Sequence, residues 1–149
     1  MDSCKCQTGP ATPAMPGVSC FTMNRLDDAD TALERGNALF RQLAPDVAQH
    51  LEQVFQHHPD LLQLGVEYVY GTLHARPQLN TRDREIVSIA VITTLGGCDE
   101  PLAAHVKLGL GAGLSEQEIR EVVLQCSAYA GFPRAISAMR KVLEICRLG

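Results

Sequence analysis

The sequence has no tryptophan, only 5% aromatic residues, no long apolar run and no excess of basic charge. Because no apolar run approaches about 20 residues, no membrane-spanning helix is predicted. A formal net charge of −4 without a basic cluster argues against a nucleic-acid-binding surface. No basic segment followed by an apolar one opens the sequence, so we expect no secretory signal and a cytoplasmic location.

Complete metal-binding and nucleotide-binding motifs are also missing. Cys4 and Cys6 stand close together, but Cys20 is the only further cysteine nearby and no histidine completes a zinc set. No phosphate-binding loop or flavin motif is found. We therefore expect no metal and no cofactor. The cysteines are expected to be free thiols in a reducing cytoplasm, with Cys126 and Cys146 as small core residues.

Length and composition fit one globular domain. With 149 residues, 46% of them hydrophobic and 20% charged, the chain can bury a substantial core without disulfide or metal staples. Residues 1–26 carry Pro10, Pro13 and Pro16 and little periodic hydrophobicity, which predicts an extended or disordered arm. Residues 27–149 are predicted to form the folded domain.

The hydrophobic pattern of the predicted domain is helical throughout. Prolines, glycines and capping residues predict helices over residues 28–43, 45–57, 59–73, 81–95, 100–111, 116–130 and 133 onward. Asn80 or Thr81 is expected to cap the fourth helix and Asp99 or Glu100 the fifth, and Ser115 and Glu118 are expected to form a capping box at the start of the sixth. The third helix is expected to be largely buried. The fourth is apolar nearly all round and is expected in the core or between subunits. No alternating strand pattern appears, so the fold class is all-α, a bundle of about six to seven helices.

A candidate site lies around the glycine turn between the fourth and fifth predicted helices. Cys98 stands at this turn and His105 follows two helical turns later, so both side chains are predicted on one side. Unpaired N–H groups at a helix N-terminus stabilise a thiolate, and histidine exchanges protons near neutral pH. The alternatives are an incidental turn cysteine and a core histidine.

Two stretches carry a family resemblance. They are residues 70–90, YGTLHARPQLNTRDREIVSIA, and residues 103–133, AAHVKLGLGAGLSEQEIREVVLQCSAYAGFP. Both resemble the carboxymuconolactone decarboxylase family, which includes the alkyl hydroperoxidase D-type thiol peroxidases. The resemblance covers about half of the chain. It implies that His105 occupies the family's signature position, and that the protein is a homo-oligomer, a trimer or hexamer, with pockets near subunit boundaries.

The resemblance also shows where this chain departs from the family. Cys98 aligns with the first cysteine of the peroxidase-type Cys-x-x-Cys-x-x-x-His motif, but Pro101 replaces the second. A proline cannot form a disulfide, so the two-cysteine cycle is not available within this motif. Decarboxylase-type members usually carry an acidic residue at that same position. Asp99 and Glu100 lie beside it as possible substitutes.

Four further residues are assigned roles around His105. Glu85 matches a glutamate of the peroxidase-type members and is expected to relay protons or orient the histidine; the alternative is a solvated capping charge. Arg84 or Arg76 is expected to hold a substrate carboxylate through a bidentate fork. His74 is expected to line the pocket or lie at a subunit contact.

Tyr129 lies in the segment Tyr-Ala-Gly-Phe-Pro, which favours a structural corner between helices. The alternative is that its hydroxyl reaches the pocket and contributes to substrate binding. The two readings differ in whether the side chain points toward His105 or away from it.

Together these residues predict an enzyme acting on a small carboxylated or carbonyl-bearing metabolite without a cofactor. His105 would serve as general acid/base for a proton transfer, in a decarboxylation, a lactone isomerisation or an elimination. One alternative is a thiol peroxidase that uses Cys98, with Cys4, Cys6 or Cys20 as resolving partner. Another is a non-catalytic oligomeric binding protein.

Overall fold

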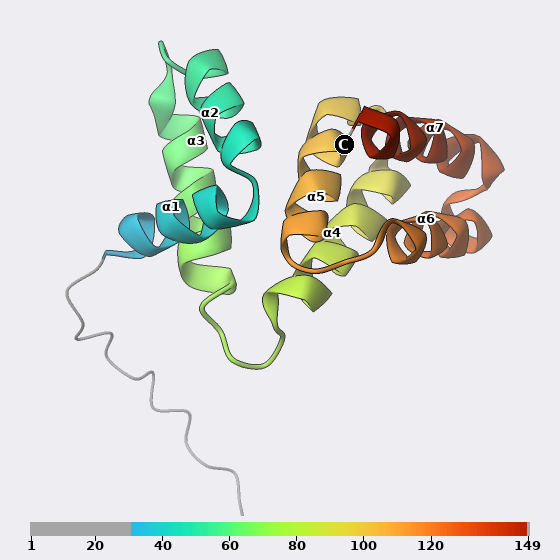
Figure 1. Ribbon diagram of the computed structural model, residues 1–149, viewed down its shortest axis with the longest axis horizontal. Coiled ribbons are helices and arrows are strands. Elements are labelled where there is room, and N and C mark those ends of the chain that lie inside the picture. The colour runs from blue at the N-terminus through green and yellow to red at the C-terminus, as the bar shows by residue number, and fades with distance from the viewer. Residues whose placement is uncertain (1–30, 149) are drawn as a thin grey trace, which may run out of the picture.

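The computed structural model describes residues 31–148, and every regular element in this range is a helix (Figure 1). The elements are α1 (Ala32–Leu43), α2 (Pro45–Val54), α3 (Pro59–Gly65), the π-helix η1 (Val66–Leu73), α4 (Thr81–Leu95), α5 (Asp99–Gly111), α6 (Glu116–Ala130) and α7 (Phe132–Leu148). The predicted all-α class is confirmed. The expected arm and Cys4, Cys6 and Cys20 lie outside the described residues. Within residues 31–148, no helix combines the length and hydropathy that a membrane span requires.

The helices form two groups, each around its own core (Figure 1). The first group contains α1, α2, α3 and η1, and the second contains α4 to α7. Helix α5 joins them, because it contacts α1 and inserts Leu108 into the first core. At the C-terminal end of α5, Gly111 lies so close to Leu43 that a Cβ would overlap the Leu43 carbonyl group. The two groups therefore meet backbone to backbone at this point.

Local signals in the sequence set several helix boundaries. The Asn80 side chain accepts a hydrogen bond from the backbone N–H of Asp83 at 2.8 Å and caps α4. Ser115 and Glu118 form the predicted capping box of α6. Gly96 ends α4 with a φ of 68°, a conformation that favours glycine.

The predicted cap of α5 is wrong. Cys98 occupies the capping position without a side-chain hydrogen bond, and Asp99 and Glu100 lie in the first helical turn. Acidic side chains there still interact favourably with the helix dipole. The α5 N-terminus is thus stabilised by charge and not by a capping oxygen.

The third predicted helix is divided and is less buried than expected. Residues 59–73 form α3, which has no buried residue, followed by the wider η1, in which Val66, Tyr70 and Gly71 are buried. Leu61 is among the exposed apolar side chains of this segment. Gly71 packs so tightly that a Cβ would overlap the Ala32 carbonyl group of α1. The close crossing with α1 and the i→i+5 bonding pattern thus occur in the same segment, which also carries buried Tyr70.

Helix α4 is buried on one face only. Glu85, Ile89 and Thr93 are buried, whereas Val87 and Val91 on the outer face are 53% and 51% exposed. The apolar surface of α4 predicted a position in the core or between subunits. Within one chain, one face of this helix is buried and the other is exposed to solvent. Burial of its outer face against a second copy remains a prediction.

Candidate functional site

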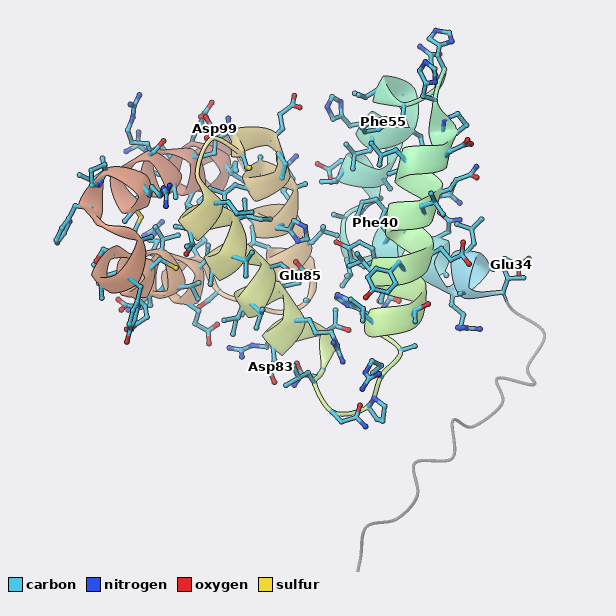
Figure 2. All side chains as sticks on the ribbon, turned by 180° about the vertical axis from the view of Figure 1, so that it is seen from behind. Glu34, Phe40, Phe55, Asp83, Glu85 and Asp99 are labelled. Carbon is cyan, nitrogen blue, oxygen red and sulfur yellow. The ribbon has the colours of Figure 1, made fainter. Side chains whose placement is uncertain are left out.

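A buried carboxylate lies at the centre of the site (Figure 2). The side chain of Glu85 on α4 is 0% exposed, and its Oε2 lies 2.8 Å from Nδ1 of His105 on α5. Gly109 of α5 helps to bring the two helices close, because a Cβ there would meet Leu114 and Ile89 and approach Glu85. Glu85 is therefore a partner of His105 and not the solvated capping charge of the alternative interpretation.

The contact with Glu85 leaves Nε2 as the ring nitrogen of His105 that does not meet the carboxylate. When Nδ1–H donates to an ionised carboxylate, Nε2 keeps its lone pair and can accept a proton. The imidazole is 21% exposed, so one part of the ring is accessible while the other meets the buried acid. This is the arrangement of a histidine base oriented by a carboxylate.

His74 lies behind the carboxylate. Its side chain is 2% exposed, and Nε2 lies 3.7 Å from Oε1 of Glu85. Burial lowers the pKa of His74, and the charge of Glu85 opposes this shift. The ring also packs against Tyr70 with centroids 4.9 Å apart, and burial raises the pKa of that phenol. His74 thus contacts the buried acid Glu85. It does not line the cavity beside His105, although the sequence suggested that it could line the pocket.

Among the described residues, His105 lines a cavity of about 450 Å³ between α5 and the helices of the first group. Most of the wall is aliphatic or aromatic, including Phe40, Val47, Leu51, Phe55, Leu62 and Val69. The ionisable residues of the wall are Asp46, His50, Tyr70, Glu100, His105 and Lys107. Lys107 donates a hydrogen bond to Asp46, which lowers the pKa of that carboxyl group. The cavity therefore combines one carboxylate-oriented histidine with a largely apolar wall.

The other predicted site residues do not line this cavity. Cys98 is partly buried at the start of α5. Arg84 donates hydrogen bonds to the carbonyl oxygens of Leu79 and Arg76, both at 3.1 Å, and so holds the loop before α4. Arg76 itself is exposed, and Tyr129 is 85% exposed on α6. Within one chain the structure brings together Glu85, His105 and His74, with the remaining candidates elsewhere.

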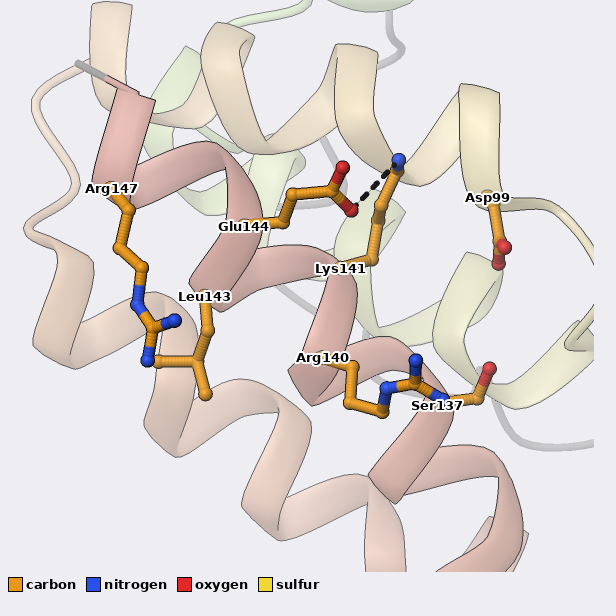
Figure 3. Close-up of a pocket in the computed structure, with 7 residues that line it drawn as sticks. All are labelled: Asp99, Ser137, Arg140, Lys141, Leu143, Glu144 and Arg147. Carbon is orange, nitrogen blue, oxygen red and sulfur yellow. Dashed lines mark hydrogen bonds and ion pairs between the residues drawn. The ribbon is translucent and has the colours of Figure 1, made fainter.

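A larger hollow of about 690 Å³ lies along α7 and does not include His105 (Figure 3). Its wall consists of Asp99, Ser137, Arg140, Lys141, Leu143, Glu144 and Arg147. Lys141 donates to Glu144 at 3.2 Å, as expected for an exposed helical ion pair. The wall of this hollow carries charges of both signs and lacks His105, so the smaller cavity is the candidate site. In residues 31–148 no cluster of three His, Cys, Asp or Glu side chains is arranged to hold a metal ion.

Comparison with known proteins gives the family. Residues 59–144 match the sequence model of the carboxymuconolactone decarboxylase family. The chain belongs to the carboxymuconolactone decarboxylase family. The 4-carboxymuconolactone decarboxylase of Acinetobacter baylyi is 32% identical over 99 residues, which cover 66% of this chain and 73% of that protein.

Two further relatives match over shorter regions. The nitrosuccinic acid decarboxylase of Metarhizium robertsii is 34% identical over 77 residues, 52% of this chain and 53% of that protein. An uncharacterised 15.0 kDa protein of Paracoccus denitrificans is 35% identical over 83 residues, 55% of this chain and 59% of that protein. The chain thus spans somewhat more than half the length of these two proteins.

The cavity wall was the part of the site that sequence reasoning missed. Its residues come mainly from positions 40–70, where the family resemblance weakens, and they follow the ordinary helical pattern of core residues. Asp46 and Lys107 of the wall are oppositely charged and form a hydrogen bond although they are 61 residues apart in the sequence. Without the fold, nothing in the sequence singles out this pair from other charged residues.

Proposed function

We propose that the protein is a decarboxylase-like enzyme that transfers a proton at a carbon atom next to a carbonyl group. The observation that carries this proposal is the 2.8 Å contact between buried Glu85 and His105 on the wall of a cavity. Membership of the family and the two relatives named as decarboxylases support it. His105 is the general acid/base, and Glu85 is the residue that orients it.

In the proposed reaction, a carboxylate of the substrate is lost from the carbon next to a carbonyl group. The C–C bond breaks, CO2 leaves, and the electron pair remains on the substrate as an enolate. Protonated His105 then delivers its Nε2 proton to that carbon, and the buried carboxylate of Glu85 stabilises the imidazolium before the transfer. The same residues perform isomerisation or elimination if His105 first removes a C–H proton.

We assign His74 to positioning instead of substrate binding. It is buried, it touches the far oxygen of Glu85 and it does not line the cavity. In this role His74 restricts the orientation of the carboxylate, which in turn orients His105. Contacts of this kind are needed because a catalytic group must be held in its productive geometry.

The test compares His105→Ala with His50→Ala. Both histidines line the cavity, but His50 is exposed on α2 and no carboxylate orients it. Substrates are sought by CO2 release from a panel of 3-oxo acids and lactone carboxylic acids, and by NMR of C–H exchange in D2O. His105→Ala should lower turnover by roughly 10²- to 10⁴-fold with its helical circular dichroism retained, whereas His50→Ala should stay within a few-fold. Equal activity of His105→Ala and the parent would remove His105 from the mechanism.

A further inference from the structure

The proposed reaction places negative charge on an oxygen atom that has no assigned partner. When CO2 leaves, or when His105 removes a C–H proton, the charge of the enolate develops on the carbonyl oxygen of the substrate. His105 acts on the carbon atom and Glu85 bonds to His105 at 2.8 Å, so neither residue is assigned to that oxygen. A hydrogen-bond donor held in place for such an oxygen usually makes the largest single contribution to catalysis. This donor has to come from the wall of the cavity beside His105.

Tyr70 is the buried hydrogen-bond donor of that wall. It lines the same cavity as His105 and is 7% exposed. The charged side chains of the wall are exposed to solvent, and they are Asp46, His50, Glu100 and Lys107. Among the described residues, Tyr70 is thus the one buried side chain of this wall that can donate a hydrogen bond.

Two neighbouring rings hold the side chain of Tyr70. Its ring centroid lies 4.8 Å from that of Phe40 on α1 and 4.9 Å from that of His74. Tyr70 and the capping residue His74 belong to the π-helical segment η1, a rare geometry that is often found at functional sites. A side chain packed in this way is positioned before a ligand arrives, as catalysis by a fixed donor requires.

The hydroxyl group of Tyr70 is not needed for packing. The other buried side chains of the first core contain no polar atom, and they are Phe40, Ala44, Val47, Ala48, Val66 and Leu108. A phenyl ring would fill the same space without the free-energy cost of burying a hydroxyl group. Burial, and also the negative charge of Glu85, raises the pKa of Tyr70, so the phenol keeps its proton at neutral pH. Tyr70 is therefore a neutral donor next to the acid that orients His105.

We propose that Tyr70 is a further catalytic residue, whose hydroxyl group donates a hydrogen bond to the carbonyl oxygen of the substrate. The proposal rests on the proposed function, which supplies the enolate. As the C–C bond breaks, its electron pair forms a C=C bond and the carbonyl π pair moves to the oxygen, where Tyr70 stabilises it. When His105 delivers its Nε2 proton to the carbon atom, the pair returns and the C=O bond forms again. Tyr70 keeps its own proton throughout.

The first test compares Tyr70→Phe with Tyr68→Phe in the full-length protein. Both changes remove only a hydroxyl group, but Tyr68 is 61% exposed and does not line the cavity. With the substrates found by CO2 release or C–H exchange, Tyr70→Phe should lower kcat by roughly 10²- to 10³-fold. KM should change at most a few-fold, and the helical circular dichroism should be retained. Tyr68→Phe should keep the parental kcat, and a folded Tyr70→Phe with parental kcat would overturn the proposal.

The second test measures the hydrogen bond itself in the infrared spectrum of a bound ketone. The probe is acetophenone, the ketone that decarboxylation of the 3-oxo acid benzoylacetate yields. Donation from Tyr70 weakens the C=O bond, so the carbonyl stretch should lie at lower frequency in the parent than in Tyr70→Phe. If Tyr70→Phe does not fold, Tyr70→3,5-difluorotyrosine keeps the ring and supplies a more acidic donor, which should lower the frequency further. Equal frequencies in the parent and the folded variant would also overturn the proposal.

The His105→Ala variant separates this proposal from the proposed function. If His105→Ala keeps full activity while the carbonyl stretch responds to Tyr70→Phe, the proposed function fails and the hydrogen bond from Tyr70 stands. If His105→Ala is inactive while Tyr70→Phe is as active as the parent, the proposed function stands and the role of Tyr70 fails.

Discussion

His74 and Glu85 face each other in the protein interior, with Nε2 of the histidine 3.7 Å from Oε1 of the carboxylate. This distance exceeds the range of about 2.7–3.2 Å for a hydrogen bond, so the pair interacts through charge and packing. The other carboxylate oxygen bonds to His105 at 2.8 Å. One buried acid therefore lies between two histidines, of which only His105 reaches the cavity.

Replacing the acid should separate activity from stability. Glu85→Gln keeps the shape of the side chain and an oxygen that can accept a hydrogen bond from Nδ1 of His105, so we expect the free energy of unfolding to change little. Turnover should fall by about 10²-fold or more, because the imidazolium loses its charged partner. Glu100→Gln removes an exposed carboxylate of the same cavity and is the matched control. A Glu85→Gln enzyme with parental turnover would show that the carboxylate does not assist His105.

The buried His74 should make stability depend on pH. Burial lowers its pKa below the ordinary value of 6.5, so the unfolded chain binds the His74 proton more readily than the folded chain. Its contribution to stability is therefore present above about pH 6.5 and is lost as the pH falls below that value. Urea unfolding at about pH 7.5 and about pH 5.5 measures the difference. The difference in the free energy of unfolding between these two pH values should be smaller in His74→Gln than in the parent. In the control His57→Gln, which replaces an exposed histidine, the difference should equal that of the parent.

The same His74 variant tests the positioning role. If His74 orients Glu85, His74→Gln should shift the pH profile of kcat and change KM little, because the ring does not touch the substrate cavity. His74→Ala should change the pH profile of kcat more than His74→Gln does. Glutamine at position 74 should therefore restore part of the activity that alanine loses. Identical pH profiles for the parent and His74→Ala would limit the residue to packing.

Thiol chemistry is tested through Cys98. It is partly buried at the start of α5 and does not line the cavity, so Cys98→Ser should keep full activity on a carbonyl substrate. After one equivalent of peroxide, mass spectrometry should find no productive disulfide between Cys98 and Cys4, Cys6 or Cys20. Such a disulfide, lost in Cys98→Ser together with peroxidase activity, would favour the redox alternative.

The exposed face of α4 predicts self-association. Val87 and Val91 leave apolar surface open to solvent, and patches of this kind usually mark interfaces. We expect light scattering to give a trimer or a larger homo-oligomer at micromolar concentration. Val87→Glu should shift the mass toward that of one chain, whereas Val54→Glu on α2 should not. A parent protein with the mass of one chain would contradict the prediction.

Helix boundaries were predictable where a single residue type determines the local backbone. Asn80 and Ser115 cap α4 and α6, and Gly96 provides the positive φ that ends α4. The division of residues 59–73 was not predictable, because hydrophobic spacing does not distinguish a π-helix from an α-helix over two turns. The π-helical segment also makes a tertiary contact, the close approach of Gly71 to α1, which hydrophobic spacing does not reveal.

The site was predictable to a similar extent. Glu85 and His105 were expected on adjacent helices, and the structure places them in contact. Arg84 was expected to bind substrate because its side chain suits a carboxylate, but two loop carbonyl groups engage it. Whether an arginine serves the loop or a ligand depends on the path of the backbone before α4. The sequence contains no local signal for that path.

The contact between Gly111 and Leu43 has a consequence for the cavity some distance away. Gly111 lies at the end of the helix whose earlier turns carry Ala103 and His105. Any side chain at position 111 would overlap the Leu43 carbonyl group and push α5 away from α1. Water would then enter beside the imidazole and weaken its interaction with the buried acid. Gly111 is thus expected to limit how much water reaches the imidazole of His105, although it does not line the cavity itself.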